Sequence, residues 1–162
     1  MERLKIYCDM DGVLANFAAA YEALTGKPES EWPKDNDQFW WPIIRKKRFW
    51  LDIPMMPDAR ILWDFLMKHH YVVILSSPGH HDTERAIVQK RLWLENNLGT
   101  PFNLILKQSE EKHHYACPNS ILIDDWGKNI KAWEAAGGRV IHHKNAEHTI
   151  NQLRLYGLGR SA

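Results

Sequence analysis

The sequence is poor in cysteine and has no long apolar run. Among its 162 residues only Cys8 and Cys117 are cysteines, too few for the disulfide framework that holds a small secreted domain together. No stretch approaches the length of about 20 apolar residues that spans a bilayer. The opening residues MERLKIYCDM lack the apolar segment of a secretory signal. We therefore expect a reduced, cytoplasmic protein without a membrane partner.

The chain also lacks an excess of charge of either sign. Lys and Arg total 21 and Asp and Glu total 20, which gives a formal net charge of +1. This balance argues against a protein that coats nucleic acid through its overall charge, so we expect no stable nucleic-acid partner. Apolar residues make up 44% of the chain, enough for the core of one domain. The composition gives no indication of the oligomeric state.

Short apolar runs alternate with longer helical patterns. Strands are expected at 4–8, 72–75, 104–106 and 121–123, and from 140 onward. Helices are expected at 58–69, 82–96, 128–136 and 147–156. In the second helix Asp82 is the expected N-cap, and Ile87, Leu92 and Leu94 are the apolar members. The alternation predicts an α/β fold in which a Rossmann-like parallel sheet is flanked by helices.

One stretch, 18–57, departs from this alternation. It is rich in proline and tryptophan: Pro28, Pro33, Pro42, Pro54, Pro57, Trp32, Trp40, Trp41 and Trp50. Because it does not read as a further strand-helix unit, we predict a small helical cap at 18–57, inserted after the first strand. Residues 1–17 and 58–162 would then form the catalytic core.

Three predicted strands end in polar side chains: Asp9 and Asp11, Ser76 and Ser77, and Asp124 and Asp125. In an open parallel sheet, ligands bind beyond the carboxyl ends of the strands, so these groups are expected to meet at one edge.

The chemistry of these side chains suits phosphate and a hard cation. Asp9 and Asp11, two residues apart in extended backbone, project to the same side, where a divalent cation such as Mg²⁺ relieves their repulsion. A solvated turn is the alternative, since Asp and Gly are common in turns. For Asp124 and Asp125 the alternative is an N-cap of the next helix, and for the two serines a plain turn before Pro78.

Together these residues resemble the haloacid dehalogenase superfamily of phosphotransferases. The first motif of that family reads here as Asp9-Met10-Asp11-Gly12-Val13, the second as Leu75-Ser76, and the fourth as Ile123-Asp124-Asp125. Within the superfamily the chain is most similar to the 5'(3')-deoxyribonucleotidases. That likeness rests on Asp-Gly-Val-Leu-Ala-Asn-Phe, Ser-Ser-Pro and Leu-Ile-Asp-Asp.

The resemblance implies a role for each site residue. Asp9 would attack phosphorus and form an aspartyl phosphate, while Asp11 would act as general acid and then as general base. The backbone carbonyl of Asp11 would also touch Mg²⁺, the expected cofactor. Ser76, the Ser77 amide and a lysine would hold the phosphoryl oxygens, and Lys112 is favoured over Lys107. Asp9, Asp124 and Asp125 would complete the metal site; which of the last two binds directly is left open.

The expected substrate is a small phosphorylated molecule, namely a (deoxy)ribonucleoside monophosphate. In the predicted cap, Trp41 and Phe49 are expected to be exposed rings that stack on the base. The neighbouring basic run 45–48 is expected to be a solvated face, although within a cap it could attract an anion. The alternatives are a phosphatase of sugar phosphates or polynucleotide ends, and a non-catalytic phosphate-binding module.

Overall fold

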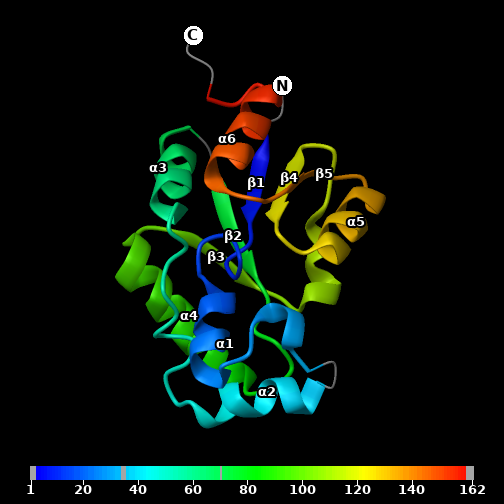
Figure 1. Ribbon diagram of the computed structural model, residues 1–162. Coiled ribbons are helices and arrows are strands. Elements are labelled where there is room, and N and C mark those ends of the chain that lie inside the picture. The colour runs from blue at the N-terminus through cyan, green and yellow to red at the C-terminus, as the bar shows by residue number, and fades with distance from the viewer. Residues whose placement is uncertain (1–2, 34–35, 70, 160–162) are drawn as a thin grey trace.

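The computed structural model describes residues 3–33, 36–69 and 71–159 (Figure 1). The strands are β1 (Lys5–Cys8), β2 (Val72–Ser76), β3 (Asn103–Leu106), β4 (Ser120–Asp124) and β5 (Arg139–His142). The α-helices are α1 (Phe17–Thr25), α2 (Asn36–Arg45), α3 (Ala59–His69), α4 (Thr83–Leu98), α5 (Gly127–Ala135) and α6 (Ala146–Leu155). Two 3₁₀ helices are η1 (Glu29–Glu31) and η2 (Ser109–Tyr115). No helix in these ranges has the length and apolar character needed to cross a bilayer.

The strands form one parallel sheet in the order β3-β2-β1-β4-β5. This arrangement confirms the predicted Rossmann-like fold. β1 lies at the centre, where Cys8 is level with Ile74 of β2 and with Ile123 of β4. This register brings the residues after Cys8, Ile74 and Ile123 to the same edge of the sheet.

Alternate strand residues face two separate helical layers. Ile6, Ile74 and Ile121 belong to a buried cluster that also contains residues of α3, α4 and α6. Tyr7, Val73 and the neighbouring strand positions on the other face pack with α5, chiefly with Trp133. Burial on both faces explains why the inner strands β1, β2 and β4 are nearly continuous apolar runs, whereas the edge strands β3 and β5 are partly exposed.

The proline-rich segment is mainly helical and lies beyond the carboxyl ends of the strands, where Figure 1 shows α1 and α2 at the end opposite α6. Its buried side chains include Tyr21, Ile43 and Trp50, which belong to the same hydrophobic cluster as one face of the sheet. The Trp93 indole of α4 donates to the Ile53 carbonyl at 2.6 Å and ties the segment to the core. The division into a core and a cap at 18–57 stays a prediction.

Helix α4 corrects two details of the sequence prediction. Asp82 stands at its N-cap position, but the residue is left-handed (φ 53°) and its carboxylate makes no capping hydrogen bond. The carboxylate instead pairs with Arg85 at 3.0 Å. The predicted apolar members Ile87 and Leu92 are exposed, because the buried stripe of α4 runs through Ala86, Lys90, Trp93 and Leu94.

Candidate active site

A tight turn after β1 places the first two acidic residues. The Asp9 amide donates to the Ile123 carbonyl at 2.8 Å, which fixes Asp9 beside β4. The amides of Leu14 and Ala15 then both donate to the Met10 carbonyl, which closes the turn. Gly12 has a φ of +85°, and a Cβ there would collide with the Asp125 carboxylate. Only glycine therefore fits this turn without moving that acidic residue.

Three carboxylates converge beyond the ends of β1 and β4. One oxygen each from Asp9, Asp124 and Asp125 lies within 4.8 Å of the other two. Burial, and secondly the nearby Asp124, raise the pKa of Asp9 well above its ordinary value. The same two causes raise the pKa of Asp125 to about 6. Such crowding of negative charge is costly unless a cation or a proton compensates it.

Lys112 is the cation that the structure brings into this group. It comes from η2 and is only 3% exposed, with its Nζ donating to Asp9 Oδ1 at 2.9 Å and to Asp124 Oδ2 at 3.2 Å. Burial alone would lower the pKa of Lys112, but Asp9 and Asp124 outweigh that effect and raise it. Lys107 is exposed. The geometry therefore brings the favoured lysine, and not the alternative one, to the carboxylates.

Asp124 is held by further donors at the start of α5. Its Oδ1 accepts from the Trp126 amide at 2.9 Å, and its Oδ2 accepts from Asn129 Nδ2 at 3.0 Å. Asp124 is not the N-cap of α5, because Trp126 holds that position and no side chain caps it. The bond from the Trp126 amide to Asp124 is a local turn contact beside the contact of Asp124 with Lys112. Asn129, which the sequence prediction did not include, orients the carboxylate.

Ser76 is the last residue of β2 and Ser77 follows it, and the two serines lie in different environments. Ser76 is buried, and its Oγ accepts from the Lys90 ammonium at 3.1 Å. The Ser77 hydroxyl donates to Gln108 Oε1 at 3.1 Å and accepts from the Gly79 amide at 3.2 Å. Ser77 therefore stabilises the turn before Pro78, which was the alternative interpretation of the two serines. It also lines a small pocket, together with Asp9.

Lys90 is a functional candidate that the sequence prediction missed. It is completely buried in α4, and its Nζ donates to Asp11 Oδ2 at 2.6 Å. The same ammonium lies 4.5 Å from the centroid of the Trp50 ring. Position 90 falls on one helical face with Ala86, Trp93 and Leu94. This spacing is a weak signal, because the apolar residues Ile87 and Leu92 favour a different face of the helix.

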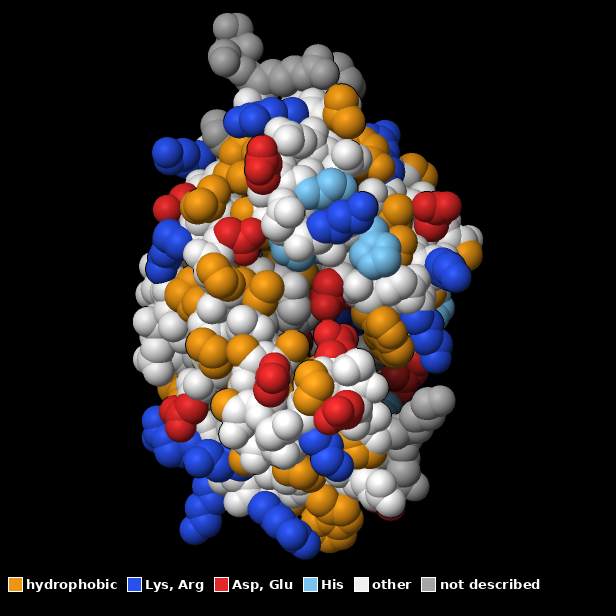
Figure 2. Space-filling model, viewed as in Figure 1, with side chains coloured by type: hydrophobic (Ala, Val, Ile, Leu, Met, Phe, Trp, Pro, Cys, Tyr) orange, Lys and Arg blue, Asp and Glu red, His pale blue; other side chains and the backbone are white. Residues whose placement is uncertain are grey.

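Two adjoining pockets open at this edge. The smaller, of about 170 Å³, is lined by Asp9, Asp11, Ser77, Ser109, Lys112, Asp124, Asp125, Trp126 and Asn129. The larger, of about 600 Å³, shares Asp11, Ser77, Ser109 and Trp126 with it and adds rings from the segment after β1. Figure 2 shows acidic side chains in the hollow near the middle of the molecule. A small polar pocket thus leads into a larger aromatic one.

The rings that line the larger pocket differ from those expected. Phe49 is 5% exposed and packs edge-on against Phe17 and Trp50, so the expectation that it is an exposed ring was wrong. Trp41 is 52% exposed, as expected, but it lies against Arg45 and outside the pocket. The pocket is lined instead by Phe17, Trp32, Phe39, Trp40 and Trp50.

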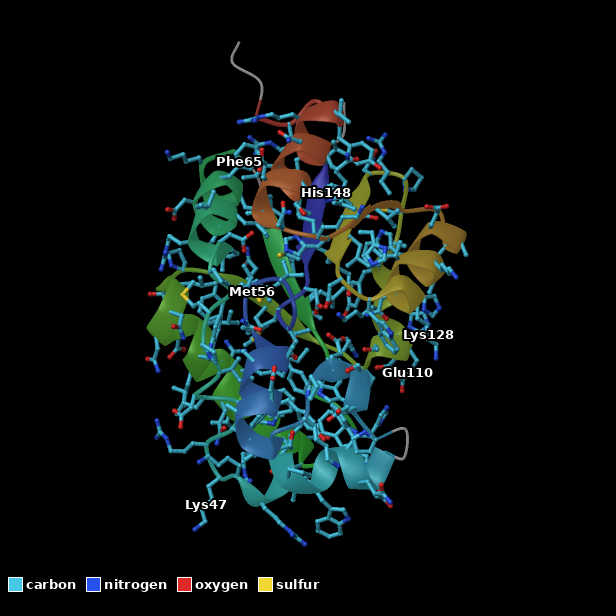
Figure 3. All side chains as sticks on the ribbon, in the orientation of Figure 1. Lys47, Met56, Phe65, Glu110, Lys128 and His148 are labelled. Atoms are coloured by element: carbon cyan, nitrogen blue, oxygen red, sulfur yellow. The ribbon has the colours of Figure 1, made fainter. Side chains whose placement is uncertain are left out.

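Polar groups complete the rim of the aromatic pocket. His80 and Glu110 both line it, and their side chains meet at 2.7 Å. His81 stacks on Trp40, with ring centroids 5.4 Å apart and planes 17° from parallel. In Figure 3 Glu110 lies beside the part of the core that carries Lys128. These two histidines come from the loop between β2 and α4.

The basic run forms a solvated face away from both pockets. Arg45, Lys46, Lys47 and Arg48 are all exposed. Arg48 pairs with Asp52 at 3.1 Å, and Figure 3 shows Lys47 pointing outward at the lower end of the molecule. None of the four lines either pocket at the sheet edge.

Comparison with known proteins finds likeness in structure alone. No family model matches the sequence, and no curated protein matches it either. Among solved structures, a haloacid dehalogenase-like hydrolase from Xanthomonas campestris is 10% identical, with a TM-score of 0.59 over 94% of this chain and 91% of that one. A HAD hydrolase from Bacillus subtilis bound to magnesium is 14% identical, with a TM-score of 0.53 over 86% of each chain.

A third structure has a comparable likeness. It is a HAD-family hydrolase from Deinococcus radiodurans with bound phosphate and sodium, 12% identical, with a TM-score of 0.52 over 96% of each chain. At such low identity these likenesses speak for the fold, and fold alone does not specify activity. The chain has the α/β fold of the haloacid dehalogenase-like hydrolases.

Proposed function

We propose that this protein is a magnesium-dependent phosphomonoesterase that acts through an aspartyl phosphate on Asp9, with nucleoside monophosphates as substrates. One observation carries the proposal. A buried carboxylate, Asp9, lies in a small pocket with a buried lysine, the two carboxylates Asp124 and Asp125, and a fourth acidic residue, Asp11. This combination supplies a nucleophile, a fixed positive charge, a set of metal ligands and an acid-base group within one pocket.

The acidic group fits a magnesium ion. Asp9, Asp124 and Asp125 would hold it, and their oxygens are already close enough to share one cation. Burial, and secondly the charge of Asp124, raise the pKa values of Asp9 and Asp125, and a bound cation would favour the ionised form of both carboxylates. When bound, magnesium neutralises charge where an anionic nucleophile meets an anionic phosphate.

The residues then divide the reaction into two displacements. An Asp9 oxygen attacks phosphorus, the bond from phosphorus to the ester oxygen breaks, and Asp11 gives its proton to that leaving oxygen. In the second displacement Asp11 takes a proton from water, whose oxygen attacks phosphorus and releases phosphate from Asp9. Lys112, which now pairs with Asp9 and Asp124, would hold the phosphoryl oxygens in both steps.

The larger pocket supports a nucleotide as the substrate. A phosphate in the small pocket would direct its ester group toward Asp11 and Trp126, which line both pockets. The space beyond is walled by rings such as Trp32, Phe39 and Trp40, and flat aromatic faces suit a nucleobase. A sugar phosphate would leave most of this apolar wall without a partner. The two neighbours that hold magnesium and phosphate add support by fold.

Phosphate release from a panel of substrates tests the proposal. Nucleoside 5'- and 3'-monophosphates, sugar phosphates and a 5'-phosphorylated oligonucleotide would be compared in Mg²⁺ and in excess chelator. We expect the highest kcat/KM for a nucleoside monophosphate, loss of turnover on chelation and recovery when Mg²⁺ is returned. Undiminished turnover in verified metal-free protein would contradict the metal dependence, and preference for sugar phosphates would contradict the substrate.

A further inference from the structure

Lys90 has an environment that is unusual for a lysine. Its side chain is 0% exposed, in the interior of α4, between the sheet and the segment that carries Trp50. A buried ammonium is costly unless it is paired and hydrogen-bonded. Asp11 Oδ2 lies 2.6 Å from its Nζ and Ser76 Oγ lies 3.1 Å from it. The ammonium of Lys90 is therefore paired with one carboxylate and one hydroxyl, both at the sheet edge.

The contact leaves the Asp11 carboxylate asymmetric. Oδ2 is bound to Lys90, whereas Oδ1 is buried and has no hydrogen-bond partner among the described residues. Asp11 lines both pockets, so the carboxylate stands where the ester oxygen of a bound phosphate would lie. A general acid must present one oxygen to that atom in a fixed direction. Anchoring the other oxygen is a direct way to fix the direction.

A third contact holds Lys90 itself in place. Its ammonium lies 4.5 Å from the centroid of Trp50, a distance that suits a cation–π interaction. Trp50 is buried, lines the aromatic pocket and packs against Trp40 and Phe17. The ammonium is surrounded by the carboxylate of Asp11, the hydroxyl of Ser76 and the ring of Trp50, which come from different segments of the chain. The packing of α4 against these segments therefore determines its position.

We propose that Lys90 is the positioning residue of Asp11, which it holds by Oδ2 so that Oδ1 serves the leaving group. The inference rests on the proposed phosphatase function. It requires that loss of Lys90 harm proton transfer to the leaving oxygen and leave phosphate binding and nucleophilic attack largely intact. Esters that differ only in the basicity of their leaving group separate these effects, because a weakly basic group departs without a proton.

The experiment measures kcat/KM with phenyl phosphate and with 4-nitrophenyl phosphate in Mg²⁺. This parameter reports the first displacement and not the later attack of water. For Lys90→Met we expect kcat/KM with phenyl phosphate to fall by about 10²-fold. With 4-nitrophenyl phosphate, whose leaving group is weakly basic, the fall should be less than about one tenth as large. Arg91→Met, a change at the exposed neighbour in the same helix, is the control and should match the wild type with both esters.

A double variant keeps the test decisive if Lys90→Met leaves Asp11 unpaired and does not fold. Asp11→Asn with Lys90→Met removes both charges of the pair and is expected to fold. If Lys90 acts only through Asp11, the double variant will have the kcat/KM values of Asp11→Asn for both esters. Equal losses with the two esters in Lys90→Met, or a further loss in the double variant, would overturn the inference while the phosphatase function stands. Absence of phosphate release by the wild-type protein would overturn both.

Discussion

At the scale of single residues, burial separates side chains that the sequence presents as equivalent. Lys107 and Lys112 both precede the acidic strand, yet the first is exposed and the second is almost fully buried between Asp9 and Asp124. Lys107 directly follows β3, whereas Lys112 belongs to η2. A buried lysine interacts with an anion more strongly than one in solvent, because the effective dielectric constant is lower there.

This difference gives a matched pair of substitutions. Lys112→Met should lower kcat at least 10²-fold, as removal of one preorganised donor to a transition-state oxygen commonly does. Lys107→Met should leave kcat within about twofold, because surface substitutions rarely matter. Initial rates of phosphate release, with thermal melting to confirm folding, check both. A severe loss in the Lys107 variant with none in the Lys112 variant would show that the lysine has been misassigned.

The burial of Lys90 was not predicted from the sequence. A lysine in a helix is ordinarily a solvated group, and the apolar residues Ile87 and Leu92 pointed to the wrong face of α4. The large side chain that fixes the true buried face is Trp93, whose indole bonds across to Ile53. No local sequence pattern predicts the hydrogen bond from Trp93 to Ile53, because the two residues lie 40 positions apart in the chain.

At the scale of elements, the segment after β1 supplies the aromatic rings of the larger pocket. Proline and tryptophan content predicted that 18–57 would not form another strand-helix unit, and it is helical. Composition could not tell which rings face inward, because adjacent residues of a helix point in different directions. Trp40 lines the pocket and Trp41 does not, and Phe49 is taken up by packing against Phe17.

These adjacent tryptophans provide the test of substrate preference. Trp40→Leu should lower kcat/KM for a nucleoside monophosphate by roughly one to two orders of magnitude, since a stacked base is worth about 1–3 kcal/mol. The value for glycerol phosphate should change much less. Trp41→Leu is the matched control and should alter neither. Equal losses with both substrates in the Trp40 variant would indicate that its ring supports the fold and does not read the base.

At the scale of the whole molecule, the sheet and the edge that carries the candidate site could be predicted from the sequence. The five predicted runs became five parallel strands, of which the inner strands β1, β2 and β4 are almost fully buried. Asp9 follows β1, and Ser76 and Asp124 are the last residues of β2 and β4. Strand ends meet at one edge in any such sheet, so the convergence of these residues follows from topology. The contacts of Lys90 and Asn129 depend on how the helices pack, which periodicity alone does not determine.

The central claim is that Asp9 is the nucleophile of a phosphatase. The most direct measurement is Mg²⁺-dependent phosphate release from 4-nitrophenyl phosphate by the wild-type protein and by Asp9→Asn, with thermal melting to confirm that both are folded. An amide is a poor nucleophile, so turnover of the variant should fall to the uncatalysed background while the wild type releases phosphate continuously. Phosphate release by folded Asp9→Asn at a rate near that of the wild type would contradict the account.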